Sequence, residues 1–264
     1  MKTFSSGMTP PLKITFMGGC HVIGFMVGKE NSFVSVCTNQ LQNNGVETKA
    51  NIYPYLNYKR GKDAIELHIN AQSDLLIFQC HYIFNPYIFK KLKSLIQKKS
   101  AKVSKIYNPN KIHSDFKSSD TNATFKPSLK FWCKQIVRHI FHSILLYRVV
   151  NKKENLLHID RFLSEFKKVG IKNIIILSPF PCTDIVVNKY RKMGNKLLEL
   201  KCKEYGYEYI DVFPLMKNAN SNKIFTIDDI HLNKYSHKYL GKFLDKHILN
   251  KNIIKVNKRI NVAS

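Results

Sequence analysis

Residues 12–21 read LKITFMGGCH, and this stretch decides the fold class. The apolar run 12–17 is short and stops at two glycines, which is typical of a buried strand. Gly18 and Gly19 let the backbone turn sharply where that strand ends. Because open α/β sheets bind their ligands outside the carboxyl ends of the strands, Cys20 is expected at a position of chemical interest. Three roles are open for Cys20: a nucleophile, a metal ligand or a small residue without a chemical role.

Predicted strands and helices alternate along the rest of the chain, in the pattern of βαβ units. Further strands are expected at 46–53, 74–80, 172–177 and 207–212, and helices at 32–43, 60–71, 87–98, 155–169, 189–205 and 234–248. The run 74–80 is apolar on both faces, as in a central parallel strand. We predict one three-layer α/β/α domain over residues 1–264, a flavodoxin-like sandwich with a parallel sheet of about five strands.

Two segments differ from this alternating pattern. Residues 99–127 are polar and aperiodic, so we expect a long loop or insertion. Residues 128–150 form a predicted basic amphipathic helix, with apolar positions on one face and Lys130, Lys134 and Arg138 opposite. We expect this helix to pack across the sheet or over the site as a cover. The alternative is a weak association with an anionic membrane surface.

The charge of the chain is strongly unbalanced. Lysine and arginine total 43 against 18 acidic residues, a net charge of +25. Such an excess favours anionic partners, but the basic residues are spread along the chain, so we predict no specific nucleic-acid partner. Six cysteines without a C-x-x-C pair indicate reduced thiols. With no signal-peptide pattern at the N-terminus, a cytoplasmic location is expected.

A second motif, Asp228-x-x-His231, lies in a predicted loop just before the last helix. This spacing lets the carboxylate reach the imidazole, orient it and stabilise its protonated form. A His–Asp pair can in turn hold a cysteine as the thiolate, its reactive form. We therefore expect Cys20 to act as nucleophile, His231 as base and Asp228 as the residue that orients the base. The backbone N–H of Cys20 is the expected oxyanion donor.

Together the two motifs resemble the first and last blocks of the SGNH/GDSL hydrolase superfamily. The last block carries Asp228, His231, Asn233, His237 and Gly241 in order. In the first block, Cys20 stands in the nucleophile position and Gly19 in the place of the family's aspartate. The resemblance covers nearly the whole chain and implies the SGNH hydrolase fold and ester-bond chemistry.

The middle blocks of that family are not matched. The third block, Gly-x-Asn-Asp after strand three, supplies an asparagine to the oxyanion hole, whereas here the strand ends in Gln79-Cys80-His81. The second-block glycine has no counterpart. Gly19, Gln79 and His81 are therefore the candidates for oxyanion or substrate binding, with their roles open.

These residues support three functions of different classes. The first is an SGNH-type ester hydrolase that acts on a small-molecule or glycan ester, expected to be an acylated carbohydrate, through a Cys-His-Asp triad. The second is an acyltransferase that modifies a cell-surface polysaccharide, with acyl-CoA as donor. The third is a catalytically silent binding protein that kept the fold. Only the transferase requires a cofactor.

A metal site uses some of the same residues. Cys20-His21, Cys80-His81, Cys182 and His231 are all expected near the carboxyl ends of strands, where thiolates and imidazoles can bind Zn²⁺. Neighbouring side chains of a Cys-His dipeptide diverge, however, so the nucleophile interpretation is preferred and no metal is predicted.

Overall fold

The structure is a computed structural model that describes residues 10–54, 65–80, 152–218, 224–225 and 231–251, together with eight positions between 128 and 140. The expected helix 87–98 and the expected insertion 99–127 lie outside the described residues.

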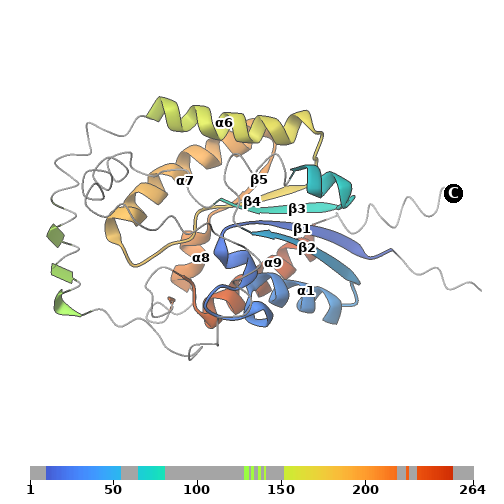
Figure 1. Ribbon diagram of the computed structural model, residues 1–264, viewed down its shortest axis with the longest axis horizontal. Helices are drawn as coiled ribbons and strands as arrows, with labels where there is room; N and C mark the ends of the chain where they lie inside the picture. The colour runs from blue at the N-terminus through green and yellow to red at the C-terminus, as the bar shows by residue number, and fades with distance from the viewer. Residues whose placement is uncertain are drawn as a thin grey trace, which may run out of the picture.

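Five parallel strands form one sheet in the order β2-β1-β3-β4-β5 (Figure 1). They are β1 Leu12–Gly18, β2 Thr48–Pro54, β3 Leu75–Gln79, β4 Ile174–Leu177 and β5 Glu208–Ile210. Phe16 of β1 is in register with Ile52 on one side and Ile77 on the other. The predicted parallel sheet of about five strands is therefore confirmed.

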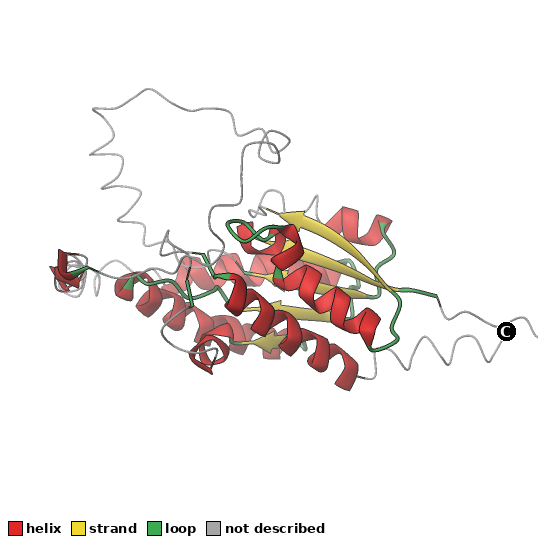
Figure 2. Ribbon diagram, turned by 90° about the horizontal axis from the view of Figure 1, so that it is seen from below, coloured by secondary structure: helices red, strands yellow, loops and turns green. Residues whose placement is uncertain are grey.

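Helices cover both faces of the sheet and make the three predicted layers (Figures 1 and 2). The helices are α1 Phe33–Asn43, α6 Lys152–Lys168, α7 Ile185–Tyr205, α8 Val212–Asn218 and α9 Lys234–Asn250. Side chains alternate across the strands, so Ile14 and Phe16 pack into the core with α1, α8 and α9, whereas Met17 packs into the core with α6 and α7. Both cores are made of fully buried aliphatic and aromatic side chains.

The short helix α8 is missing from the predicted pattern, because seven residues are too few for helical periodicity to stand out. A local contact from Asp211 and a tertiary contact from Ser178 hold its first turn. The Asp211 carboxylate accepts the Phe213 N–H at 3.0 Å, and the Ser178 hydroxyl accepts the Val212 N–H at 2.9 Å. Helices α6 and α7 each begin three to four residues before their predicted starts at 155 and 189.

The segment 128–140 differs from expectation in its packing. Every described residue of 129–140 is helical, as predicted, yet its apolar side chains are exposed. Leu129 has 80% of its surface exposed and Val137 has 66%. The expectation that this face packs across the sheet or over the site is therefore wrong for these residues. None of the described helices is long and apolar enough to cross a membrane.

Helices α1 and α9, far apart in the sequence, pack directly against each other at two points. Gly241 of α9 faces Val36 of α1 so closely that an added Cβ would lie 2.6 Å from the Val36 Cβ. His237 of α9 is fully buried and accepts the Phe33 N–H on Nδ1 at 3.0 Å. That bond satisfies a backbone donor in the first turn of α1, where a helix leaves its N–H groups without internal partners.

The close approach at Gly241 predicts a loss of stability in Gly241→Ala. The new methyl group must displace Val36 or the helix backbone, and overpacking of this kind typically costs about 1–3 kcal/mol. The higher helix propensity of alanine offsets only about 1 kcal/mol of that cost. Urea unfolding should show a lower free energy of unfolding, whereas Lys238→Ala, on the exposed side of α9, should be close to neutral. A Gly241→Ala protein as stable as wild type would contradict the packing described.

The burial of His237 predicts acid sensitivity. Desolvation, with a smaller contribution from the charge of His231, lowers the pKa of His237 from 6.5 to about 3. Between these values the unfolded chain binds a proton that the folded chain does not, so the free energy of unfolding falls as pH drops below 6.5. At pH 5 the free energy of unfolding should be about 2 kcal/mol lower than at neutral pH because of this group alone.

The variant His237→Asn should reduce this dependence, because its amide oxygen can accept the Phe33 N–H but does not titrate. We expect the difference in urea stability between pH 7.5 and pH 5 to be smaller in the variant. Equal pH slopes for the two proteins would show that His237 is not a neutral buried group.

Candidate active site

The turn after β1 presents Cys20 at the carboxyl edge of the sheet. A short 3-10 helix, Cys20–Ile23, begins here, and Cys20 is half-buried. Gly24 ends this helix with φ at 69°, a left-handed conformation that favours glycine, and the Phe25 N–H returns to the Cys20 carbonyl at 3.1 Å. The N–H of Cys20 is the first of this helix and has no acceptor within it, so it is available to a bound group.

Cys20 and His231 lie in direct contact although 211 residues separate them in the chain. The Cys20 Sγ is 2.8 Å from the His231 Nε2, a hydrogen-bond distance. The His231 ring also lies near the ring of Phe25, with centroids 4.7 Å apart. A thiol in hydrogen-bond contact with an imidazole can pass its proton to that ring and become a nucleophilic thiolate.

The loop that carries His231 is held by the start of α9. Asn233 is the N-cap residue of this helix, and its side chain accepts the Ser236 N–H at 3.0 Å. The Asn233 N–H and the Ser236 hydroxyl both donate to the Ile224 carbonyl, at 2.9 and 2.8 Å. Leu232, next to His231, is fully buried in the core. The motif residue Asn233 therefore holds the loop that carries His231.

His21 is the second imidazole beside the thiol. Its Nε2 accepts the Leu232 N–H at 3.4 Å, so the neutral ring carries its proton on Nδ1, which lies 4.0 Å from the Cys20 Sγ. Phe180 packs edge-on against the His21 ring at 4.7 Å and lines the buried side of the site. Phe180, in the segment 178–181 that follows β4 (Ile174–Leu177), thereby helps to hold the His21 ring beside the Cys20 sulfur.

The Gly18-Gly19 pair is explained by Gln79 at the end of β3. An added Cβ on Gly18 would lie 2.7 Å from the Gln79 Cβ, so only glycine fits. The Gly19 N–H donates to the Gln79 Oε1 at 3.0 Å in a buried position. This bond occupies the Gly19 N–H, so the geometry does not favour Gly19 as an oxyanion donor. Among the described residues, the buried Gln79 Nε2 has no hydrogen-bond partner, and it keeps a donor to offer.

The structure thus brings together four of the predicted site residues: Cys20, His231, Gly19 and Gln79. Asp228 and His81 lie outside the described residues. From the sequence, His21 is a candidate only for the alternative metal site, and Phe25 and Phe180 have no predicted role. The only available signal was adjacency to Cys20 for His21, because ring-to-ring contacts have no sequence pattern.

The alternative metal site gains no support from the described residues, where no group of three or more histidine, cysteine, aspartate or glutamate side chains is placed to hold a metal ion. Burial raises the pKa of the Cys80 thiol well above its ordinary value, as expected for a core side chain. Cys182 is also buried, and its N–H donates to the Asn188 side chain at 2.9 Å.

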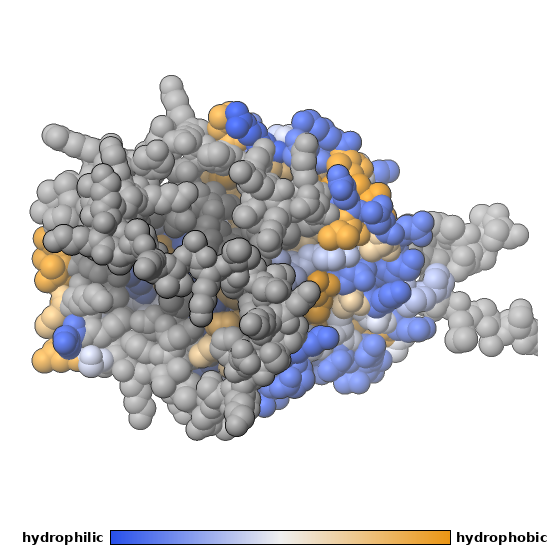
Figure 3. All heavy atoms as spheres, in the orientation of Figure 1, coloured by the Kyte–Doolittle hydropathy of each residue, from blue (hydrophilic) through white to orange (hydrophobic). Residues whose placement is uncertain are grey.

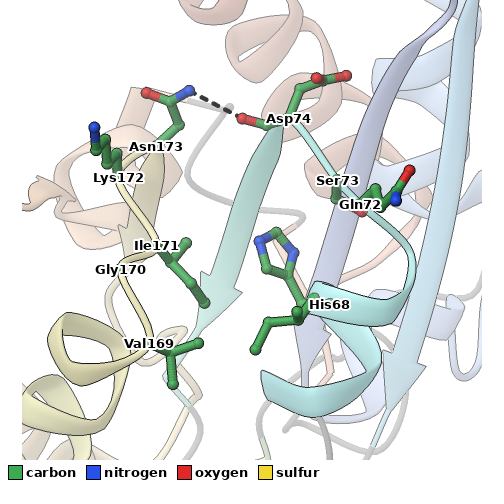
Figure 4. Close-up of a pocket in the computed structure, with 10 residues that line it drawn as sticks. His68, Gln72, Ser73, Asp74, Val169, Gly170, Ile171, Lys172 and Asn173 are labelled. Carbon is green, nitrogen blue, oxygen red and sulfur yellow. Dashed lines mark hydrogen bonds between the residues drawn. The ribbon is translucent and has the colours of Figure 1, made fainter.

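A pocket of about 340 Å³ lies at the opposite edge of the sheet (Figure 4). Its lining includes Asp74 and Asn173, which immediately precede β3 and β4, and the Asn173 side chain donates to the Asp74 carbonyl at 3.0 Å. His68 also lines it and is buried, which lowers its pKa. Because this pocket is at the amino ends of the strands, it is separate from the Cys20 site.

Comparisons with known proteins agree on the fold. No family model matches the chain, and no curated protein matches it by sequence. Solved structures do match. A lipase/acylhydrolase from Enterococcus faecalis is 10% identical with a TM-score of 0.51, and the alignment covers 89% of this chain and 94% of the other.

Two solved structures of carbohydrate esterases also align with this chain over nearly their whole length. A family 3 carbohydrate esterase from Clostridium thermocellum is 8% identical, with a TM-score of 0.55 and coverage of 95% and 99%. An acetylxylan esterase from Geobacillus stearothermophilus is 11% identical, with a TM-score of 0.55 and coverage of 92% and 98%. At these identities the likeness concerns the fold. The chain has the α/β fold of the SGNH/GDSL lipases and esterases.

Proposed function

We propose that this protein is an ester-bond hydrolase of the SGNH type that acts through Cys20 and His231. The observation that carries the proposal is the 2.8 Å contact between the Cys20 Sγ and the His231 Nε2 at the carboxyl end of β1. Proximity of a nucleophile and a base within hydrogen-bond reach is the geometric requirement for covalent acyl transfer. The shared fold with esterases supports the same reaction class.

The reaction follows from these two groups. His231 takes the thiol proton, and the Cys20 thiolate attacks the acyl carbonyl to form a tetrahedral oxyanion, which the Cys20 N–H stabilises. When the intermediate collapses, the C–O bond breaks and His231 returns the proton to the leaving alcohol. Water then attacks the thioester with His231 as base, releasing the acid and the free thiol. In this proposal Asp228 orients His231.

His21 has a supporting role in the same scheme. Its Nδ1–H faces the sulfur at 4.0 Å and can stabilise negative charge that forms there. The Gln79 amide, held over the turn by the Gly19 N–H, is the candidate second oxyanion donor. An acylated carbohydrate is the proposed substrate class, supported by the carbohydrate esterases among the fold neighbours.

Acyl transfer to a polysaccharide hydroxyl is the second candidate, and the sulfur nucleophile is the observation that favours it. A thioester passes its acyl group to another nucleophile more readily than an ordinary ester does. Acyl-CoA is the proposed donor, and the charge of +25 suits its phosphates. In both schemes the protein is proposed to act in the cytoplasm. A catalytically silent binding protein is the remaining alternative.

Mass spectrometry of the intact protein tests the nucleophile directly. After incubation with an activated short-chain ester, we expect one acyl group on Cys20. The variants Cys20→Ala and His231→Ala should lose or strongly slow this labelling, because the first lacks the sulfur and the second the base. Cys133→Ala, which removes an exposed thiol, should leave labelling unchanged.

The fate of the adduct separates the functions. If the acyl group is lost from Cys20 in buffer alone, the protein is a hydrolase. If the adduct forms from acyl-CoA and is lost only when an alcohol acceptor is added, the protein is a transferase. Failure to label Cys20, or unchanged ester turnover in Cys20→Ala, would contradict the proposed nucleophile and favour the binding protein.

The contribution of His21 is tested with His21→Phe, which keeps a ring against Phe180 but removes both the N–H that faces Cys20 and the Nε2 that accepts the Leu232 N–H. Loss of the contact with Cys20 alone, about 1 kcal/mol, predicts acylation at pH 7 roughly fivefold slower. Phe180→Leu is the matched control, since it loosens the ring packing and keeps the imidazole. Equal slowing in both variants would show that His21 acts through packing alone.

A further inference from the structure

An apolar stripe is exposed along the helical segment 129–140. The described apolar side chains of this segment are all exposed, with exposed fractions between 43% and 80%: Leu129, Trp132, Ile136, Val137 and Ile140. Spacings of three and four residues place four of them on one face of a helix. In Figure 3 apolar residues are exposed in orange groups at the left end of the molecule, the end where Figure 1 places the described turns of this segment. A continuous apolar stripe of this kind marks an interaction surface rather than an ordinary solvated helix.

The charge around the stripe identifies its partner. Residues 128–153 contain six lysine and arginine residues and no acidic residue. Two copies of this chain that paired through the stripe would bring two such basic segments together, which like-charge repulsion opposes. Anionic lipid headgroups attract the same residues, and the apolar stripe can enter the boundary between headgroups and acyl chains. A tryptophan in the stripe fits this boundary, where its amphipathic ring is favoured.

We infer that the helical segment 129–140 docks the protein onto an anionic membrane surface, with its apolar stripe at the interface. The inference goes beyond the proposed function and does not depend on it. Figures 1 and 2 place the described turns of this segment beyond the carboxyl ends of the strands, on the side where β1 leads into Cys20. Docking therefore turns the catalytic edge of the sheet toward the membrane.

The chain itself supplies the probe, because Trp132 is its only tryptophan. We expect Trp132 emission to shift to shorter wavelength, and its quenching by acrylamide to fall, when vesicles of phosphatidylcholine and phosphatidylglycerol are added. Vesicles of phosphatidylcholine alone should produce little change. High salt should weaken the binding, because it screens the contribution of the basic residues.

Charge-reversal variants of the full chain give a matched comparison. The triple variant Lys130→Glu, Lys134→Glu, Arg138→Glu should bind anionic vesicles on the order of tenfold or more weakly in co-sedimentation. The control Lys238→Glu, Lys242→Glu, Lys246→Glu makes the same change of net charge on the exposed side of α9 and should bind nearly as wild type.

Three outcomes would overturn the inference. The first is Trp132 emission that does not respond to anionic vesicles, or responds equally to neutral ones. The second is an equal loss of binding in the two triple variants, which would assign the effect to net charge alone. The third is emission already shifted without vesicles and dependent on protein concentration, which would assign the stripe to self-association. Hydrolysis of a soluble ester by the docking variant reports separately on the proposed function.

Discussion

The contact between the Gly18-Gly19 turn and Gln79 is the constraint on which the rest of the site depends. Gly18 leaves room for the Gln79 side chain, and the Gly19 N–H bonds its Oε1 at 3.0 Å. This buried contact joins the ends of β1 and its neighbour β3, the central strand of the sheet. It determines where β1 stops and therefore where the Cys20 sulfur is presented.

Helix packing supplies the second half of the site. Helix α9 lies against α1 through the close approach of Gly241 and the buried bond from Phe33 to His237. Asn233 caps α9 two residues after His231, so the same packing that closes one face of the sheet brings the His231 ring to the Cys20 thiol. Asn233 and His237 of the motif thus have structural contacts, and their spacing reflects how the loop enters the helix. The stability of the fold and the Cys20–His231 contact depend on the same pair of helices.

Prediction from sequence worked where a single periodicity dominated. Buried runs such as 74–80 and the amphipathic pattern of α9 indicated the order of strands and helices, and that order was enough for the fold class. It failed for α8, whose first turn depends on side chains of Ser178 and Asp211, and for the packing of segment 128–140. An amphipathic pattern indicates that one face of a helix is apolar. It does not indicate which segment packs against that face, because this depends on the tertiary structure.

By itself the sequence determined that the chain forms a parallel α/β sheet and that a cysteine follows its first strand, since both follow from local hydrophobic patterns and glycine content. Only the tertiary structure decided which groups meet that cysteine. The contact with His231 spans 211 positions, and the orientation of His21 depends on the Leu232 N–H and the Phe180 ring. Such contacts depend on the packing of separate segments, and no local pattern records a distance between side chains.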